Sequence, residues 1–350
     1  MAGGTIWADA EDQAIYERYA TEGKSLVLPG RTPQATCQRA HILGVKYIGP
    51  AEDSFQPKRF WQKTRGRSVE YVRKPVDWNE ILSSLKPGSY PKPKEAVKNG
   101  RMLEVAEVDA HFGKQSWKPE SGAGYDLKIA DQAHRDAALD FSKRLGADSF
   151  ERVLLLGGQD CLHIANPEGT TSRGTQLDYD SRFQKIVKSR IEYEVWRVGL
   201  WLKKGPVTYV SSPGNHSFVA EMMLTEVLKA WYRDCPQVDF LDAPSDRQYL
   251  QFGKVGLGFS HGDKTKPQRS RELFAAEAPK IWGATEFREF HAGHLHAESV
   301  NTGPGCTYRV LKALCPADKW HSDQGYVALP GSQAFVWDKA KGLDFTLNRH

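Results

Sequence analysis

The chain from Gly100 onward alternates apolar segments with segments of helical pattern, and this alternation constrains its fold more than any other feature. Five apolar segments predict strands at 102–108, 152–156, 206–211, 255–260 and 287–292. Helical patterns lie between them at about 132–146, 182–203, 218–233 and 269–281. Strands that alternate with helices predict an α/β domain with layered sheets. Near the C-terminus, the alternating segments 325–329, 334–337 and 343–347 favour antiparallel strands that close the domain.

Each of the five apolar segments is followed by side chains that can bind a metal ion. In chain order these are Asp109 and His111, Asp160, Asn215, His261, and the pair His294 and His296. In layered α/β domains the loops at the carboxyl ends of strands gather at one edge, so the five motifs can meet in one site. One Asp-x-His motif is common by chance, whereas five motifs in series indicate a shared site.

The predicted ligands offer oxygen and imidazole nitrogen and no sulfur. Such donors suit Mn²⁺, Fe or Zn²⁺ better than a soft metal. They are numerous enough for two cations that share a bridging carboxylate, which is the arrangement that holds a phosphoryl group. We therefore expect two divalent metal ions, with Mn²⁺ first and Fe or Zn²⁺ as alternatives.

The order of these motifs resembles that of the calcineurin-like metallophosphoesterases over about residues 100–350. Asp109-x-His111, Asp160, Gly214-Asn215-His216, His261 and Gly293-His294-x-His296 carry the resemblance. Leu162-His163, Gly169-Thr170-Thr171, Gly174-Thr175 and Trp320-His321 are similar to a phage and prophage-encoded group, distantly like the repair nucleases of the superfamily. The resemblance implies a four-layer α/β sandwich of two mixed sheets flanked by helices.

The resemblance also implies a role for each site residue. It implies a first metal site with Asp109, His111 and His296, a second with Asn215, His261 and His294, and Asp160 as the bridge between them. His216 is implied to lie beside the substrate, where it stabilises the transition state or protonates the leaving oxygen. His163 resembles a histidine that repair nucleases place near the substrate, and a packing role for it is equally open. Ser217 stands where the family commonly has an acidic residue, so a carboxylate that supports the ligands is expected to be missing.

Residues 1–48 are expected to form a small helical unit. A helical pattern covers Ala10 to Glu22, and a second helix is predicted to start at Thr32 and Pro33 and to end before Gly44. Its inner face would consist of Thr36, Ala40 and Leu43, and its outer face of Gln34, Gln38 and His41.

This unit resembles the Myb/SANT-like helix-turn-helix modules and related phage modules. Trp7, Glu11-Asp12, the Leu-Pro-Gly-Arg-Thr of 28–32, Arg39-Ala40 and Leu43-Gly44 carry the resemblance. It implies a three-helix DNA-binding domain whose last helix presents Gln34, Gln38 and His41 to the major groove, with Arg31 at a phosphate. A module that docks another protein is the alternative.

Residues 49–99 are rich in proline and read as a basic linker. Lys58, Arg59 and Lys63 are interleaved with aromatic residues, a pattern suited to nucleic-acid contact, although a tether whose Trp61 packs on the next domain fits equally. Residues 1–100 contain 16 Lys and Arg against 11 Asp and Glu, an excess equal to the whole net charge of +5. This excess favours a polyanionic partner.

The predicted function is hydrolysis of phosphodiesters in DNA by a nuclease, in which a hydroxide that bridges two metal ions attacks phosphorus in line. One alternative is a hydrolase of nucleotides, cyclic nucleotides or phosphomonoesters whose N-terminal module docks a partner. A second alternative is a DNA-binding protein with a structural metal domain. The sequence lacks a long apolar run and an export signal, so we expect a cytoplasmic protein without a membrane partner, in a bacterial host if it is phage-encoded.

Overall fold

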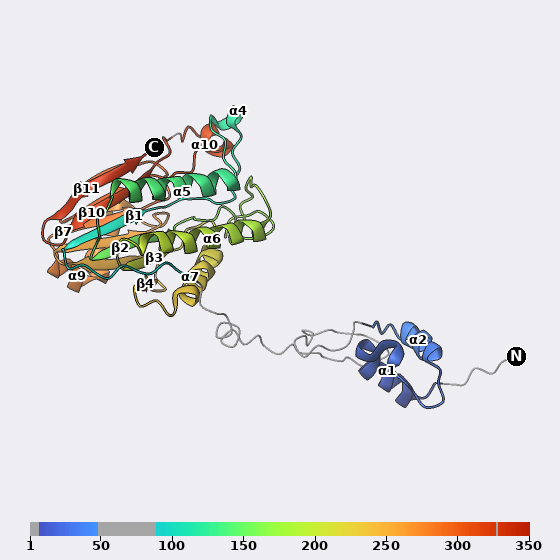
Figure 1. Ribbon diagram of the computed structural model, residues 1–350. Helices are drawn as coiled ribbons and strands as arrows, with labels where there is room; N and C mark the ends of the chain where they lie inside the picture. The colour runs from blue at the N-terminus through green and yellow to red at the C-terminus, as the bar shows by residue number, and fades with distance from the viewer. Residues whose placement is uncertain (1–6, 48–88, 327) are drawn as a thin grey trace. The chain divides into compact units, whose positions relative to one another are not determined.

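The computed structural model describes residues 7–47, 89–326 and 328–350, and the chain divides into two compact units, Met1–Ile81 and Leu82–His350 (Figure 1). Lys58, Arg59 and Lys63 lie outside the described residues, so their contact with nucleic acid stays a prediction. No helix within the described ranges is both long enough and apolar enough to cross a bilayer.

The N-terminal unit contains the helices α1 (Asp9–Glu22) and α2 (Pro33–Ile42), with the 3-10 turn η1 (Gly23–Ser25) between them. The side chain of Thr32 accepts a hydrogen bond from the backbone N–H of Ala35 at 3.1 Å, as predicted for the residue that caps α2. Residues 7–47 contain two α-helices, whereas three helices were expected. The helix-turn-helix assignment stays a prediction.

The surface of α2 follows the predicted pattern. Thr36 and Ala40 are buried, whereas Gln34, Gln38 and His41 are exposed. Arg31 donates to both carboxylate oxygens of Glu11 at 2.7 Å, and its guanidinium carbon lies 4.1 Å from the centre of the Trp7 ring. Arg31 thus joins the start of α2 to α1, and its contact with phosphate remains a prediction.

The first sheet of the second unit is mixed, with four parallel strands and an antiparallel pair at one edge. In spatial order its strands are β11 (Gly342–Arg349), β10 (Ser332–Asp338), β1 (Arg101–Ala106), β2 (Arg152–Gly158), β3 (Val207–Ser212) and β4 (Val238–Leu241). The strand expected at 325–329 is wrong, because none of its described residues is in a strand. Gly325 takes a φ of 74° after the short helix α10 (Lys319–Asp323), and Pro330 has no N–H to donate to a ladder.

The second sheet is also mixed, because β6, β7 and β9 are parallel and the strands at its two edges are antiparallel. In spatial order its strands are β5 (Gln248–Phe252), β6 (Val255–Ser260), β7 (Phe287–Ala292), β9 (Cys306–Val310) and β8 (Ser299–Gly303). The helix expected at 269–281 is two helices, α8 (Pro267–Glu277) and α9 (Pro279–Ala284). Pro279 opens the second helix because it lacks the N–H that would continue the first.

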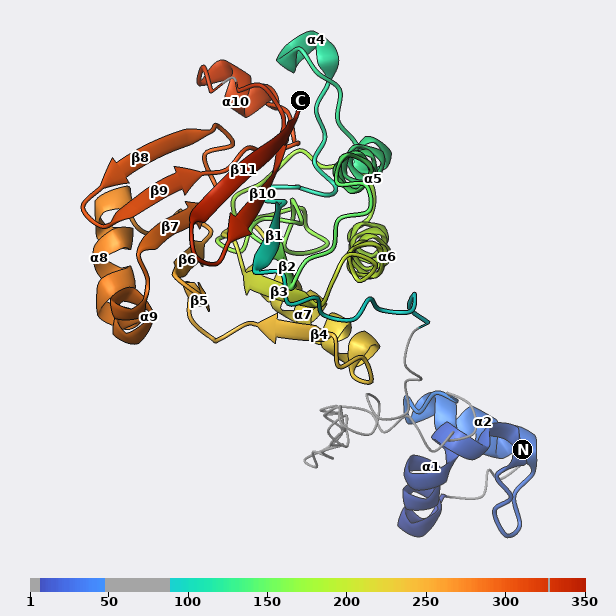
Figure 2. The same cartoon turned by 60° about the vertical axis from the view of Figure 1, so that its left-hand side comes forward.

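The two sheets face each other between two layers of helices (Figure 2). The helices α5 (Leu127–Arg144), α6 (Phe183–Trp201) and α7 (Phe218–Tyr232) cover the first sheet, and α8 and α9 cover the second. Leu154 and Val210 of the first sheet pack against Leu257 and Phe259 of the second. Strands buried on both faces explain why their sequences read as continuous apolar runs. The α/β architecture with two mixed sheets agrees with the prediction.

A buried cluster of charged side chains joins α6 to the chain just after β1. Glu194 accepts hydrogen bonds from Arg190 at 2.5 Å and from Arg197 at 2.9 Å. Glu107 accepts one from Arg190 at 3.1 Å. Burial alone would raise the pKa of Glu107, but Arg197, His134 and Arg190 hold it well below its usual range. The cluster therefore anchors the segment that leads into Asp109.

Candidate active site

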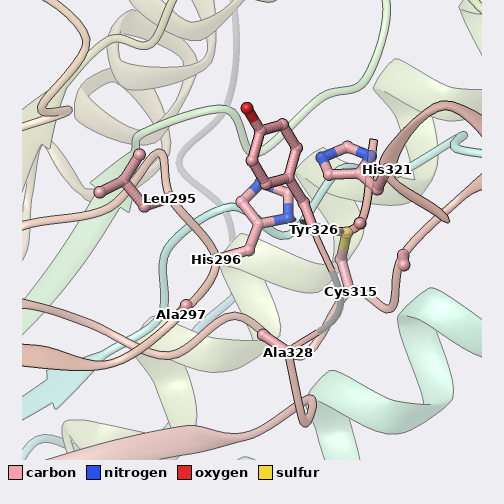
Figure 3. Close-up of a pocket in the computed structure, with 9 residues that line it drawn as sticks. Leu295, His296, Ala297, Cys315, His321, Tyr326 and Ala328 are labelled. Atoms are coloured by element: carbon pink, nitrogen blue, oxygen red, sulfur yellow. Dashed lines mark hydrogen bonds between the residues drawn. The ribbon is translucent and has the colours of Figure 1, made fainter. Parts of the chain in front are cut away.

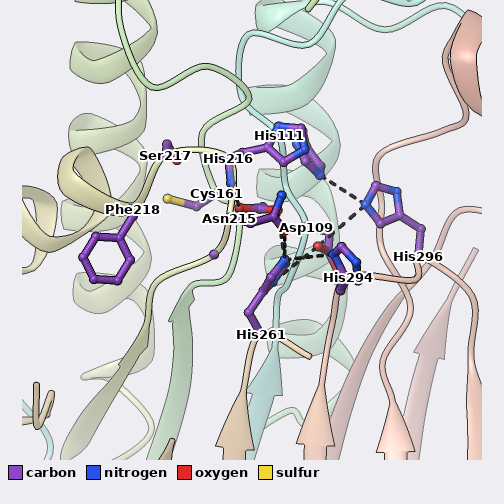
Figure 4. A network of polar contacts seen from close by, with 12 residues as sticks. Asp109, His111, Cys161, Asn215, His216, Ser217, Phe218, His261, His294 and His296 are labelled. Atoms are coloured by element: carbon purple, nitrogen blue, oxygen red, sulfur yellow. Dashed lines mark hydrogen bonds and ion pairs between the residues drawn. The ribbon is translucent and has the colours of Figure 1, made fainter. Parts of the chain in front are cut away.

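The seven predicted ligands lie together where five strands from both sheets end; Figure 4 labels six of them, and Asp160 lies 3.0 Å from His261. Asp109 and His111 follow β1, Asp160 follows β2, Asn215 follows β3, His261 follows β6, and His294 and His296 follow β7. The two sheets bring their strand ends to the same edge of the sandwich, so residues far apart in the chain share one site.

The described residues contain four groups of three side chains whose donor atoms could hold a cation, and two of these groups share a carboxylate. One group consists of Asp109, His111 and Asp160, and the other of Asp160, His261 and His294, with the donor atoms of each group within 4.8 Å of one another. Asp160 belongs to both groups and is almost completely buried. Asp160 is therefore the carboxylate that these two sets of donors have in common, and its contact with two cations stays a prediction.

His296 and Asn215 extend the two groups. His296 places its Nε2 atom 3.1 Å from Nε2 of His111, and Asn215 places its Oδ1 atom 2.9 Å from Nε2 of His261. All seven residues are thus brought together, in the two sets that the resemblance implies. Their roles as metal ligands stay a prediction, for which this geometry gives a specific test.

The carboxylates of Asp109 and Asp160 have pKa values shifted in opposite directions. Burial raises the pKa of Asp109 to about 7, and within the described chain no donor reaches its Oδ1 atom. Burial alone would raise the pKa of Asp160 too, but His261 at 3.0 Å and the backbone N–H of His216 at 2.7 Å hold it well below its usual range. A buried carboxylate oxygen without a donor is costly unless a cation compensates it. Asp109 therefore fits a metal ion.

The imidazoles of this cluster differ. Burial alone would lower the pKa of His261, but Asp160 and then Asp109 raise it to about 10, whereas His111 and His296 are shifted the other way. Burial, and then His216 and His296, lower the pKa of His111 well below its usual value. Burial, followed by Lys114 and His321, does the same for His296. A neutral imidazole is the form that binds a metal ion. Oxygen and nitrogen donors at this spacing fit divalent cations such as Mn²⁺, Fe²⁺ or Zn²⁺, and the sulfur of Cys315 is a further potential donor beside His111 and His296.

The backbone of the ligand loops is strained. Non-glycine residues with positive φ occur at seven places in the described chain, and six of them carry or adjoin predicted ligands: Asp109, His111, Gln159, Asp160, His294 and His296. Left-handed φ values in residues with a Cβ atom are unfavourable and cluster at functional sites. Gln159, directly before Asp160, adopts a φ of 52°, a conformation that glycine takes more readily than a residue with a side chain.

Two glycines of the motifs allow the loops to approach the carboxylates. A Cβ atom on Gly214 would lie 2.0 Å from Oδ1 of Asp160, and one on Gly293 would lie 2.5 Å from Oδ2 of Asp109. Any side chain at either position would collide with a predicted ligand. This explains why Asn215 and His294 are each preceded by glycine.

The two predicted catalytic histidines occupy different environments. His216 is half-buried, and its Nδ1 atom lies 2.8 Å from the carbonyl oxygen of His163. His163 is buried, and its Nδ1 atom lies 3.2 Å from Nδ1 of His111. Of these two histidines, only His216 combines partial exposure with a ring held in place beside the donor groups. His163 contacts a predicted ligand directly, and its contact with substrate stays a prediction.

Glu221, on the first turn of α7, was missed by sequence reasoning. Its buried carboxylate accepts hydrogen bonds from the backbone N–H of Cys161 at 2.7 Å, the N–H of Gly214 at 2.8 Å and the hydroxyl of Ser217 at 2.9 Å. It therefore ties the loop of Asp160 to the loop of Asn215. The carboxylate expected to be missing at Ser217 is present one helical turn later, and the spacing of four residues after Ser217 was the available signal.

We expect Glu221→Gln to weaken metal binding or activity roughly 10- to 100-fold. The glutamine amide would face two backbone N–H donors, so at least one loop would lose its acceptor. Metal dissociation constants and kcat/KM measured on the same preparations check this. Glu226→Gln on the same helix is the matched control, because Glu226 is 64% exposed at its side chain and pairs with Lys229. Equal metal affinity in the wild type and Glu221→Gln would contradict the role of Glu221.

Lys114 and Cys315 are two further site residues without a sequence signal. Lys114 is buried and donates to the carbonyl of Pro316 at 2.8 Å and to the sulfur of Cys315 at 3.3 Å. The sulfur of Cys315 lies 3.8 Å from Nδ1 of His296, and Cys315, His111 and His296 offer donor atoms within 4.8 Å of one another. Burial raises the pKa of Cys315 to about 11, so the thiol keeps its proton. Cys315 therefore contacts the ring of His296, and Lys114 holds Cys315 in place.

Comparison with known proteins finds no matching family model and no matching curated protein. Similar solved structures include an archaeal phosphodiesterase, with 10% identity, a TM-score of 0.33, and coverage of 71% of this chain and 98% of that chain. A predicted phosphoesterase from Streptococcus pneumoniae has 10% identity, a TM-score of 0.30, and coverage of 71% and 97%. Zinc-bound Vps29 from Entamoeba histolytica has 11% identity, a TM-score of 0.30, and the same coverage. At these values the likeness alone assigns neither a family nor a function.

Proposed function

We propose that this chain is a metal-dependent phosphodiesterase that hydrolyses DNA with two divalent cations, Mn²⁺ being the first candidate. The observation that carries the proposal is the position of Asp160 in both groups of donor atoms. Paired cations that share a carboxylate are the usual means of stabilising both the attacking and the leaving oxygen of a phosphoryl transfer. The orphaned Oδ1 atom of Asp109 supports a cation on the same site.

When bound, the two cations would neutralise charge on the phosphoryl oxygens and lower the pKa of a water molecule for in-line attack. Asn215 would act as an uncharged ligand, which limits the negative charge that faces an anionic substrate. The Nδ1 atom of His216 is engaged by the carbonyl of His163 at 2.8 Å, which leaves Nε2 for a phosphoryl or leaving oxygen. The backbone N–H of His216 also donates a hydrogen bond to Asp160. His216 would thus orient a predicted ligand with its backbone and contact the substrate with its side chain.

The N-terminal unit supports DNA as the substrate. Gln34, Gln38 and His41 are exposed on a single face of α2, and amide side chains of this kind can pair with base edges in the major groove. The excess of five positive charges in residues 1–100 adds attraction to phosphate. A hydrolase of small phosphate esters would have no evident need for such a unit.

A substrate panel with Mn²⁺ tests the proposal. The full chain should cut end-labelled DNA and a chromogenic phosphodiester, and replacement of Gln34, Gln38 and His41 by alanine should weaken DNA cleavage while leaving the small diester unaffected. Hydrolysis of small nucleotides or phosphomonoesters without DNA cleavage would favour the alternative function. Absence of hydrolysis throughout the panel, with metal bound, would favour a structural role for the metal domain.

A further inference from the structure

A pocket of about 250 Å³ opens directly beside the metal centre. His296, a predicted ligand, forms part of its wall, together with His321, Tyr326 and Leu295 (Figure 3). His296 belongs both to this pocket and to the cluster of donor atoms. A substrate whose phosphate lies among those donor atoms would therefore place the chemical group attached to that phosphate at the pocket. We call this cavity the ring pocket.

Two large exposed aromatic side chains lie at this place: Tyr326 lines the ring pocket, and Trp320 is outside the lining but contacts the ring of Tyr326. Trp320 is 60% exposed and Tyr326 is 61% exposed, and their ring centres lie 5.8 Å apart. Trp320 also meets the ring of His321 edge to face at 5.1 Å. Exposed aromatic rings next to a site provide flat apolar surface on which a planar ligand can stack.

The imidazole of His321 is held in a fixed orientation between these rings and the metal centre. Its Nδ1 atom lies 2.7 Å from Oδ1 of Asp318, and the same oxygen accepts the backbone N–H of His321 at 2.9 Å. The other oxygen of Asp318 lies 3.2 Å from Nζ of the buried Lys114. The ring of His321 stacks on that of His296 at 5.2 Å with an interplanar angle of 24°. A continuous series of rings therefore leads from the metal centre to Trp320 and Tyr326.

We propose that the ring pocket binds the base of the nucleotide next to the scissile phosphate, stacked on Trp320 and Tyr326. The inference rests on the proposed function, because a nucleoside is the planar group that adjoins the phosphate in DNA. Stacking of a base on an aromatic side chain tolerates every base, so the pocket would add affinity without sequence preference. It would also distinguish nucleotides from phosphate esters that lack a planar group.

Equilibrium binding to the Mn²⁺-loaded full chain tests the ring pocket independently of turnover. The probes are a phosphorothioate-linked trideoxynucleotide, which resists hydrolysis, and the same backbone with all three bases removed. The wild type should bind the base-bearing probe roughly tenfold more tightly or better than the abasic probe. Trp320→Leu and Tyr326→Leu should each reduce this preference several-fold and leave the affinity for the abasic probe unchanged. Trp320→Phe should retain most of the preference, because it keeps an aromatic ring.

Phe287→Leu is the matched control, because Phe287 is an exposed aromatic residue at the opposite, N-terminal end of β7. Equal affinity of the wild type for both probes, or an unchanged preference in Trp320→Leu and Tyr326→Leu, would overturn the inference. DNA cleavage by a wild type that binds both probes equally would leave the proposed function in place and remove only the ring pocket. Preference for the base-bearing probe without DNA cleavage would support the pocket and remove the DNA phosphodiesterase.

Discussion

Replacement of Asp160 by asparagine is expected to lower kcat/KM for a phosphodiester roughly a thousandfold or more, and to reduce the metal content of the protein. Asp160 is the one side chain shared by both groups of donor atoms, and it is buried within hydrogen-bonding distance of His261 and the backbone of His216. Asparagine has nearly the same shape but lacks the charge, and its amide nitrogen cannot bind a cation. Metal analysis by mass spectrometry and steady-state kinetics on the same samples measure both effects.

Asp178→Asn provides the control for this experiment. The change is chemically identical, but Asp178 is exposed and lies outside both groups of donor atoms. It should therefore retain metal and activity. The two-ion site would be refuted if Asp160→Asn kept a full complement of metal and wild-type kinetics. A thermal melt of each variant separates loss of the site from loss of the fold.

Glu194→Gln is expected to destabilise the protein by about 3–5 kcal/mol, with little direct effect on the chemistry of the site. Glu194 is fully buried and balances the charges of Arg190 and Arg197, and it also accepts a hydrogen bond from the hydroxyl of Tyr209 at 3.2 Å. Glutamine would keep the volume but leave the cluster with an excess buried positive charge. The expected loss corresponds to a fall in Tm of roughly 10 °C for a domain of this size.

Glu192→Gln is the control on the same helix. Its side chain is 62% exposed and lies 3.8 Å from Lys188, so the pair should contribute less than about 1 kcal/mol. Chemical denaturation of the two variants and the wild type gives the comparison. Similar unfolding free energies for Glu194→Gln and Glu192→Gln would show that the buried cluster does not hold α6 to the first sheet.

Local sequence patterns predicted the elements that carry the site. The five predicted strands that precede the predicted ligands are all present, within about two residues of their expected bounds. Buried parallel strands are apolar along their whole length, so their ends are visible in the sequence wherever polar residues begin. The short strands β4, β5, β8 and β9 were not predicted, because edge and half-exposed strands lack such a run.

Local sequence patterns did not reveal the charged residues that hold the loops of the site in place. Glu221 and Lys114 are charged residues that the sequence alone would place at the surface, yet both are buried and hold ligand loops together. The exposed face of α2 followed from helical spacing, whereas the pairing of Arg31 with Glu11 joins residues twenty positions apart. Contacts of this kind depend on how elements pack, and no local pattern encodes them.

The sequence by itself determined the five strands that precede the predicted ligands, the identity of those ligands, and the glycines that directly precede Asn215 and His294. Only the tertiary structure decided that the donor atoms of both sheets meet around Asp160, that Glu221 joins two loops, and that Tyr326 lines a pocket with His296 while Trp320 is exposed against Tyr326. The physical reason is the separation along the chain of the residues that interact. Backbone conformation and burial periodicity are set by neighbours in the chain, whereas a site is assembled from side chains that approach one another only after two sheets have packed.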